Sequence, residues 1–427
     1  MSIQKFFKLY FAGIIVFCVA LIVRIGYNVF VGHNYQPLFD AHFFRDTGLN
    51  LVHEGCFCLP AHVHSVGRAP IWPTIIGLIS VPFGTSTLYP RLFLCLTGAL
   101  TCVIIYLFAQ NLFGRRVALI TGLLAAIYPG MFIYDGWLYS EGFYTFVLTC
   151  FSYSLYKVLQ TKKIAWMIAS GFFIAACALT RPNGLILIGL VFLWALALCV
   201  AKGISWKKGI QTFVIATLVA SLFIIPWTIR NYNVTGKIIP IEVSEGATIA
   251  GSYNDTVLKE NPYGYGMWMP QHYISPPLKD NKDATETEAG LHWIRTHLSS
   301  MPYLLTLHFA NLWVPYTSEL GLPMMQNPGA ISSRIVWNMV WIMTPIIIAV
   351  AALGLLLTWR RWKELLVVYL LILLTCATCI AFYGSSRFRA PIEPLLILLT
   401  GACIWWFSSD APGSLRYYRQ HKTWREE

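Results

Sequence analysis

Long apolar runs limit most strongly what this chain can fold into. A helix needs about 20 apolar residues to cross the hydrocarbon core of a bilayer. Only 12% of the 427 residues are charged, about half the share typical of soluble domains. The sequence therefore predicts an all-α polytopic membrane protein. Ten runs approach or exceed the spanning length, at 9–30, 88–112, 117–134, 137–160, 165–180, 184–201, 209–227, 334–358, 364–383 and 390–408.

The first run follows Lys5 and Lys8, a pattern that signal peptides share. The run is longer than the apolar core of a signal peptide and has no small-residue cleavage site. We therefore expect it to be retained as the first of about ten transmembrane helices.

Basic clusters between the runs predict the orientation, because cytoplasmic loops of membrane proteins are rich in Lys and Arg. With ten helices and a cytoplasmic N-terminus, every cluster falls on the cytoplasmic side. The clusters are Lys5/Lys8, Arg115/Arg116, Lys162/Lys163, Lys207/Lys208, Arg360/Arg361/Lys363 and Arg416/Arg419/Lys422/Arg425. These clusters account for the net charge of +12 without a nucleic-acid partner, which we do not expect.

The segments that carry most of the acidic residues then lie on the opposite side of the membrane. They are residues 31–87, residues 229–333 and short turns near 135, 182 and 385. Of the 19 acidic residues, all but Glu364, Asp410, Glu426 and Glu427 lie at or near this side. We therefore expect a multi-pass protein of the plasma (inner) membrane whose active site faces the outer, periplasmic side.

The chain divides into three sections. Residues 1–228 form a transmembrane module that includes the first outer loop, residues 229–333 form an outer region, and residues 334–427 hold the last helices and a short cytoplasmic tail. Two apolar stretches, 69–84 and 301–316, do not fit as spans, because either one would reverse the sides of the basic clusters. We expect both to lie along the outer surface or to enter the membrane without crossing it.

Nine of the eleven cysteines lie inside apolar runs, where they suit packing as small hydrophobic residues. Cys56 and Cys58 differ, because they share a polar segment with His53, His62 and His64. Such side chains are metal ligands, but their spacing matches no known zinc pattern. We therefore expect no metal site.

Seven ionisable residues from different parts of the chain fall at the outer ends of the runs. Charge at membrane depth is costly and usually marks a functional site or a paired structural charge. An excess of arginine suits a phosphate, which the guanidinium fork binds through two oxygens. A carboxylate suits proton abstraction from a hydroxyl. Taken singly, each residue could instead cap a helix or reach to the interface. The seven are Asp40, Arg68, Glu141, Arg181, Arg230, Arg387 and Arg389.

Several motifs at these positions resemble one enzyme family. The pattern D-x3-[YF]-x3-[AG]-x2-L-x3-G-x-F, which begins at Asp40, resembles the first outer loop of GT-C membrane glycosyltransferases. The resemblance is strongest to the protein-mannosyltransferase and aminoarabinose-transferase branch (glycosyltransferase family 39 type). It extends in order through GRAPIWP (67–73), the runs at 91–130, LYSEGFYTF (138–146), LTRPNG (179–184), IPWTIRNY (225–232) and SSRFRAPIEP (385–394).

The resemblance implies a role for each residue. Asp40 takes the position of the catalytic base, and Arg68 and Arg230 take positions that contact the donor phosphate, together with Arg387 and Arg389. The remaining candidates, Glu141, Arg181 and Asn231, would support the site, with Glu141 pairing to an arginine. The chain departs from the family pattern at three positions, which leaves the donor-lipid contacts open: Phe44 replaces a tyrosine, Gly48 an alanine and Ala69 a proline.

The implied reaction is transfer of a sugar from a polyprenyl-phosphate donor to a hydroxyl of a glycan, lipid or protein acceptor, with inversion. No cofactor is expected, and a divalent cation is compatible with the site but not required. A transporter or flippase for a lipid-linked sugar is the main alternative, although no internal repeat of the kind found in transporters is present. A ligase that uses a diphosphate donor predicts similar arginines but not the Asp40 motif. The acceptor contacts would come from residues 229–333.

Overall fold

The computed structural model describes residues 3–59, 63–259, 264–269, 283–317 and 320–408. Within these ranges, ten long helices correspond one to one with the ten predicted runs. They are α1 (Ile3–Phe30), α4 (Leu88–Phe113), α5 (Arg115–Ile127), α6 (Glu141–Thr161), α7 (Ile164–Ala178), α8 (Ile186–Val200), α9 (Trp206–Thr235), α14 (Ile331–Leu357), α15 (Trp362–Ala381) and α17 (Glu393–Phe407).

Seven of these helices, counted with the short turns that adjoin them, are long and apolar enough to cross a membrane. The other three are α5, α6 and α7, of which α5 and α7 have only 13 and 15 residues. The predicted all-α polytopic architecture is therefore confirmed. Helix α17 forms the centre of the bundle, with 83% of its apolar window buried, whereas 22% of the α9 window is buried. The central α17 contacts α14, α4 and α5.

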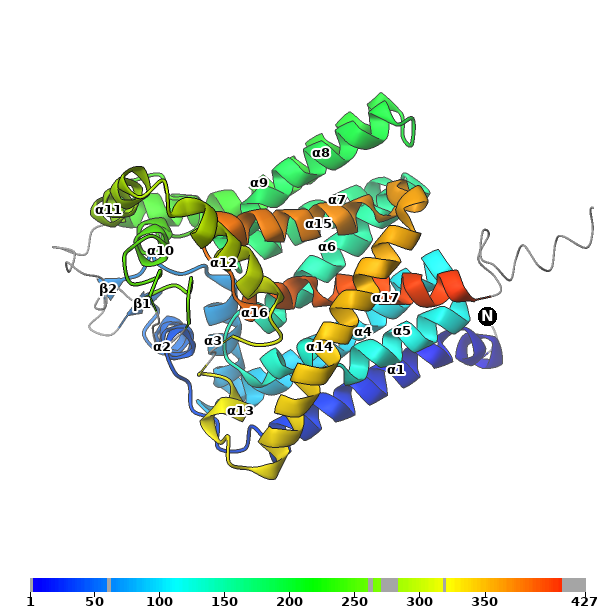
Figure 1. Ribbon diagram of the computed structural model, residues 1–427, viewed down its shortest axis with the longest axis horizontal. Helices are drawn as coiled ribbons and strands as arrows, with labels where there is room; N and C mark the ends of the chain where they lie inside the picture. Colours follow the sequence, from blue (N-terminus) through cyan, green and yellow to red (C-terminus); the bar gives the residue numbers. More distant parts are fainter. Residues whose placement is uncertain (1–2, 60–62, 260–263, 270–282, 318–319, 409–427) are drawn as a thin grey trace, which may run out of the picture.

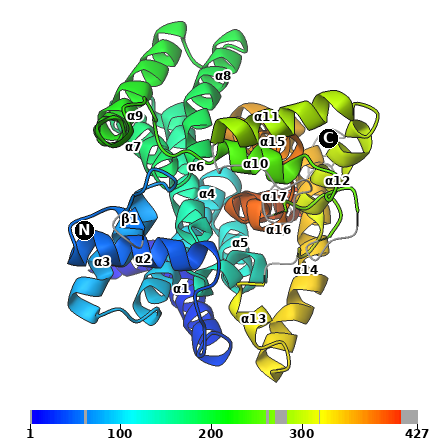
Figure 2. The same ribbon diagram turned by 90° about the vertical axis from the view of Figure 1, so that its left-hand side faces the viewer.

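The basic connections and the segments predicted to lie outside are at opposite ends of the bundle (Figure 1). The N-terminal end of α1, the α8–α9 connection and the end of α17 lie at one end. The other end holds α2 (Asp40–His53), the strands β1 (Cys58–Leu59) and β2 (Val63–His64), α10 (Glu245–Ser252) and α11 (Asp283–Thr296). Seen from that end, α2 lies across the bundle, and α8 and α9 form a hairpin at its edge (Figure 2). This arrangement agrees with the predicted alternation of sides.

The two apolar stretches that did not fit as spans form short helices. They are α3 (Ile71–Phe83) and α12 (Met301–Trp313), each of 13 residues. Helix α3 packs against α2, and α12 packs against α15 and α16 (Ser386–Arg389). A further short helix, α13 (Pro323–Gln326), precedes α14. The predicted outer turns are built from 3-10 helices: η2 (Pro129–Met131), η3 (Ile133–Gly136), η4 (Pro182–Leu185) and η7 (Ala390–Ile392), with η6 (Trp359–Arg361) at the opposite end.

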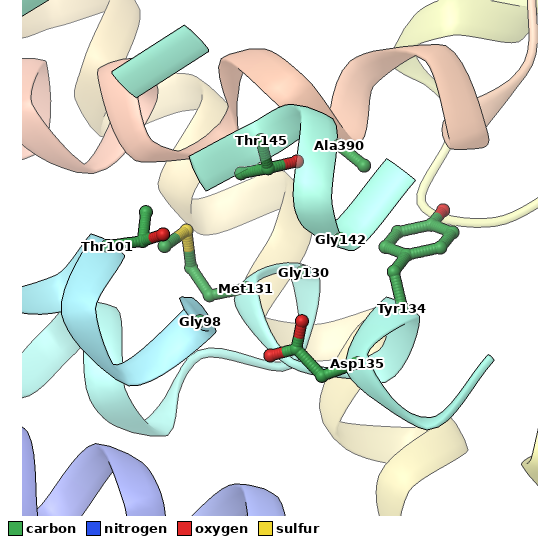
Figure 3. Close-up of a pocket in the computed structure, with 9 residues that line it drawn as sticks. All are labelled: Gly98, Thr101, Gly130, Met131, Tyr134, Asp135, Gly142, Thr145 and Ala390. Atoms are coloured by element: carbon green, nitrogen blue, oxygen red, sulfur yellow. The ribbon is translucent and has the colours of Figure 1, made fainter. Parts of the chain in front are cut away.

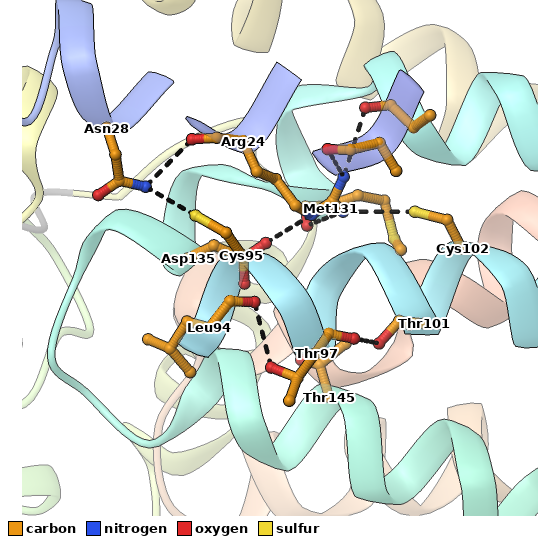
Figure 4. Close-up of polar contacts among 12 residues, drawn as sticks. Arg24, Asn28, Leu94, Cys95, Thr97, Thr101, Cys102, Met131, Asp135 and Thr145 are labelled. Carbon is orange, nitrogen blue, oxygen red and sulfur yellow. Dashed lines mark hydrogen bonds and ion pairs between the residues drawn. The ribbon is translucent and has the colours of Figure 1, made fainter. Parts of the chain in front are cut away.

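A buried ion pair fixes η3 against α1. Arg24 Nε donates to Asp135 Oδ2 at 2.7 Å, and Arg24 Nη2 donates to the Met131 carbonyl at 2.9 Å (Figure 4). The Asp135 carboxylate also borders a small cavity, together with the hydroxyls of Thr101 and Thr145 (Figure 3). Because both charged side chains are almost wholly buried, each depends on the other to offset its desolvation. This pair was not predicted from the sequence, although a lone arginine inside an apolar run is a signal for a partner.

Candidate active site

Asp40 is the first residue of α2 and directly follows a strained residue. Phe39 has φ 53° and ψ −128°, a region that residues other than glycine rarely adopt. The backbone N–H of Asp40 donates to the Tyr139 hydroxyl at 3.2 Å. The Asp40 side chain keeps 35% of its surface exposed, so its carboxylate is accessible to a substrate.

Helix α2 is held in place by a close approach to α3. A Cβ on Gly48 would lie 2.3 Å from the Pro73 carbonyl oxygen, and one on Gly77 would lie 2.2 Å from the Gly48 carbonyl oxygen. Only glycine lets two helix backbones approach this closely. The departure from alanine at Gly48 therefore has a packing reason, and it fixes the helix that carries Asp40.

Arg68 contacts Asp40 directly. Its Nη2 donates to Asp40 Oδ1 at 2.9 Å, and its Nη1 donates to the Gly67 carbonyl at 2.8 Å. The guanidinium also lies over the rings of Phe43 and Phe44, at 5.7 and 5.9 Å from their centres. These contacts orient Arg68 while leaving 28% of its side chain exposed.

A second cluster of charge surrounds Glu141, the first residue of α6. Arg387 Nε lies 2.7 Å from Glu141 Oε1, and Arg181 Nη1 bonds to the same oxygen. The Glu141 side chain is only 1% exposed, so it depends on these two arginines for compensation. Its position at a helix N-terminus also favours a negative charge.

Arg387 joins the two clusters. Its Nη2 lies 3.9 Å from Asp40 Oδ2, and its guanidinium stacks 4.9 Å from the centre of the Tyr139 ring. The result is a line of alternating charges that brings together five of the predicted residues. In order they are Arg68, Asp40, Arg387, Glu141 and Arg181.

Glu242, which lies next to this line, was not among the residues predicted for the site. Val243 N–H donates to the Val66 carbonyl at 2.9 Å, so the segment around Glu242 runs beside the one that carries Arg68. The Ala69 backbone N–H donates to the Glu242 carboxylate, and Ser244 Oγ donates to Glu242 Oε1 at 2.9 Å. Burial raises the pKa of Glu242 above its ordinary value, and the positive charge of Arg68 offsets part of that shift. The sequence signal was a single carboxylate in the otherwise apolar stretch 238–243.

Arg389 is not part of the line, although it lies two residues from Arg387. Its Nε donates to Glu393 Oε1 at 2.6 Å, and its other nitrogens donate to the carbonyls of Leu312, Val314 and Pro315. The residue is 2% exposed. The predicted phosphate contact does not fit this geometry, because the guanidinium is buried and engaged in holding the end of α12.

Arg230 and Asn231 also lie outside the line. Arg230 Nη1 donates to the Ser65 carbonyl at 2.6 Å, and its Nη2 donates to the Phe57 carbonyl at 3.0 Å. Asn231 Nδ2 donates to the carbonyls of Ile239 and Ile241 at 3.1 and 2.9 Å. Both residues therefore anchor loops to the end of α9, and Arg230 reaches the site only through the segment that leads to Arg68.

The cysteines that suggested metal ligation are joined to each other. Cys56 and Cys58 form a disulfide. The nearby His64 Nδ1 lies 3.7 Å from Cys56 Sγ, and His62 lies outside the described residues. Among the described residues, no group of three His, Cys, Asp or Glu side chains is placed to hold a metal ion.

Comparisons with known proteins agree with the fold. Residues 67–229 match the model of the family described as dolichyl-phosphate-mannose-protein mannosyltransferase. The oligosaccharyltransferase of Archaeoglobus fulgidus in its apo form is similar in structure over 100% of this chain and 53% of its own, with a TM-score of 0.57 and 13% identity. The archaeal oligosaccharyltransferase AglB, also from Archaeoglobus fulgidus, in complex with an inhibitory peptide and a dolichol-phosphate, matches over 98% of this chain and 54% of its own, with a TM-score of 0.54 and 13% identity.

ArnT from Cupriavidus metallidurans bound to undecaprenyl phosphate is also similar, with a TM-score of 0.45 and 16% identity over 95% of this chain and 77% of its own. None of the curated proteins matches the chain. The chain spans about half the length of the archaeal oligosaccharyltransferase. The chain is therefore a polytopic membrane protein with the GT-C fold, as the resemblance of its motifs predicts.

Proposed function

We propose that this chain is a glycosyltransferase that moves a sugar from a polyprenyl-phosphate donor to a hydroxyl of an acceptor. The observation that carries the proposal is the contact between the partly exposed Asp40 carboxylate and two arginines, Arg68 at 2.9 Å and Arg387 at 3.9 Å. A carboxylate beside fixed guanidinium groups suits a reaction in which a hydroxyl loses a proton while a phosphate leaves.

In the proposed reaction, an Asp40 oxygen accepts the proton of the acceptor hydroxyl. The hydroxyl oxygen forms a bond to the anomeric carbon as the bond from that carbon to the phosphate oxygen breaks, with inversion. Arg68 and Arg387 stabilise the negative charge that develops on the leaving polyprenyl phosphate. Because the two guanidinium groups supply the positive charge that neutralises the leaving phosphate, the proposed reaction does not require a divalent cation.

The polar atoms at the site support a bound ligand. Within the described part of the chain, Arg68 Nε and Glu141 Oε2 are buried and have no hydrogen-bond partner. Buried polar groups are normally satisfied, so a donor phosphate on Arg68 and a sugar hydroxyl on Glu141 would complete them. We assign Arg181 to positioning Glu141, and we leave Arg230 and Arg389 out of the donor site.

The neighbours make a lipid-linked donor the best-supported substrate. The family model that matches residues 67–229 is named for a dolichyl-phosphate-mannose donor, and the archaeal enzyme of the same fold was solved with a dolichol-phosphate. We place the site at the outer, periplasmic face of the plasma (inner) membrane, because the basic connections lie at the opposite end of the bundle (Figure 1). The acceptor would approach from the segment 229–333.

Reconstitution separates this function from its alternatives. The full chain in liposomes would receive labelled polyprenyl-phosphate sugar and a cell-envelope fraction as acceptor source. The proposal predicts release of free polyprenyl phosphate together with labelled acceptor. Movement of intact labelled lipid across the bilayer without such release would instead indicate a flippase, and turnover only with a polyprenyl-diphosphate donor would indicate a ligase.

A further inference from the structure

The Cys56–Cys58 disulfide lies between the two residues that form the Asp40–Arg68 ion pair along the chain. The two sulfurs differ in access. Cys58 is fully buried, whereas Cys56 is partly exposed and its Sγ lies 3.7 Å from His64 Nδ1. An external thiol can therefore approach only one sulfur of the bond, and an imidazole lies beside that sulfur.

The disulfide fixes the backbone of Phe57, which anchors this loop to α9. The Phe57 ring is 5% exposed and packs edge-on against Trp227, with ring centres 4.9 Å apart. The Phe57 carbonyl accepts hydrogen bonds from Arg230 Nη2 and from the Ser65 N–H, both at 3.0 Å. Closing the small ring through Cys56 and Cys58 holds the side chain and the carbonyl of Phe57 in these contacts.

The same loop contacts the helix that carries Asp40 and the strand that leads to Arg68. Asn50 of α2 donates through Nδ2 to the Cys58 carbonyl at 3.1 Å, and its own carbonyl accepts from the Cys56 N–H at 3.4 Å. Asp40 begins that helix. On the other side, the strand β2 pairs His64 with Cys58 and leads into the segment that carries Arg68. The disulfide loop is therefore hydrogen-bonded to the helix that Asp40 begins and paired with the strand that leads to Arg68.

We propose that Cys56–Cys58 is a thiol–disulfide exchange site for a dithiol oxidoreductase, and that its oxidised form holds Asp40 and Arg68 in register. A thiolate of the partner attacks Cys56 Sγ, which forms a mixed disulfide and releases the Cys58 thiolate. The second thiolate of the partner then attacks the partner's sulfur in the mixed disulfide. This step forms a disulfide in the partner and releases the Cys56 thiolate beside His64. The net step reduces one disulfide of this chain and oxidises one dithiol, and it runs in reverse on oxidation.

The effect on sugar transfer rests on the proposed function, whereas the exchange itself does not. Disulfides persist in oxidising compartments, which agrees with the proposed outer face. In the reduced form the Phe57 anchor loosens, so the α2–α3 connection becomes more mobile and the catalytic pair loses alignment. A displacement of about 1 Å can lower a rate by about 100-fold.

The test uses the full chain in detergent with dithiothreitol as the dithiol probe. Differential alkylation with mass spectrometry reports the state of Cys56 and Cys58, and limited proteolysis reports the connection between α2 and α3. We expect the purified protein to hold the bond, dithiothreitol to open it, and the connection to become sensitive to protease. His64→Ala should slow the opening of the disulfide by several fold. Cys18 is an exposed free cysteine, and the control variant Cys18→Ala should behave as wild type.

Two variants and the activity assay complete the design. Cys56→Ser/Cys58→Ser should match the reduced protein in protease sensitivity and should not respond to dithiothreitol. Transfer should fall about 10-fold or more on reduction and recover on reoxidation. Free thiols at both positions in the purified protein, or reduction that leaves proteolysis and transfer unchanged, would overturn the proposal. If the wild type transfers no sugar, the proposed function fails, while alkylation and proteolysis still decide the exchange site.

Discussion

Arg387 Nε lies 2.7 Å from Glu141 Oε1, while Nη2 of the same guanidinium lies 3.9 Å from Asp40 Oδ2. One side chain of α16 therefore joins the first residue of α6 to the first residue of α2. The bond to the buried Glu141 is the shorter of the two, so Glu141 positions the arginine and Asp40 keeps an accessible oxygen. A phosphate that binds Arg387 would compete with Asp40 for Nη2 and leave the carboxylate free to take a proton.

Arg387 and Arg389 offer a matched comparison on one short helix. Arg387→Lys keeps the charge but loses the fork, so kcat/KM for sugar transfer should fall about 100-fold with little change in thermal stability. Arg389→Met leaves Glu393 buried without its partner, which should destabilise the protein by about 3–5 kcal/mol. Transfer assays and thermal unfolding in detergent distinguish the two. An Arg389→Met protein that is stable but inactive would return Arg389 to the donor site.

Gly48→Ala should destabilise the packing of α2 on α3. The added methyl group would lie 2.3 Å from the Pro73 carbonyl oxygen, so the helices must separate, at a cost of about 1–3 kcal/mol. Gly189→Ala in α8 is the control, since nothing lies within 4 Å of its new Cβ, and it should be neutral or slightly stabilising. Thermal unfolding checks both, and equal effects of the two substitutions would contradict the close approach.

The helices could be predicted from the sequence, whereas several contacts within the candidate site could not. The ten helices were predictable because hydropathy is a local property of each run. The meeting of Asp40, Glu141 and Arg387 followed from the shared side of the membrane. Arg387 and Arg389 were not separable, because their difference depends on carbonyls from the distant segment 312–315.

Other features depended on contacts that leave no periodic signal. Glu242 comes from a long connection and reaches Arg68 only because its segment pairs with the Val66 backbone. Arg24 was visible as a charge in an apolar run, but its partner Asp135 lies 111 residues away. The Cys56–Cys58 disulfide was not predicted, because the two cysteines and the nearby histidines were weighed only as metal ligands, whose spacing matches no known zinc pattern.

The strain at Phe39 should be measurable through two substitutions. Phe39 is 53% exposed, so its ring contributes little packing, whereas its backbone conformation costs about 1–3 kcal/mol. Phe39→Gly should therefore raise thermal stability relative to Phe39→Ala, which keeps the strain. If the strained backbone of Phe39 orients the Asp40 side chain, the glycine variant should also have a lower kcat without a change in KM. Identical stability of the two variants would argue against strain at this residue.

The burial of His308 should make the protein less stable at acidic pH. It is fully buried in α12, its Nδ1 bonds to the Ile380 carbonyl at 3.1 Å, and burial lowers its pKa to about 4. Between that pKa and the unfolded value of about 6.5, only the unfolded chain binds the proton. The contribution of His308 to stability should therefore be complete well above pH 6.5 and fall as the pH drops toward 4, by up to about 3 kcal/mol. His308→Asn should flatten this part of the pH profile of thermal unfolding, and an unchanged slope would contradict the assignment.

The central claim is that Asp40 is the catalytic base, and Asp46 provides its control on the same helix. Asp46 pairs locally with His42 at 3.0 Å and Arg45 at 3.5 Å, so Asp46→Asn should leave transfer nearly unchanged. Asp40→Asn should keep the fold and donor binding but lower kcat by about 10²- to 10⁴-fold. The most direct measurement is release of polyprenyl phosphate from labelled donor by the two variants in matched liposomes. Release by Asp40→Asn at the wild-type rate would contradict the account.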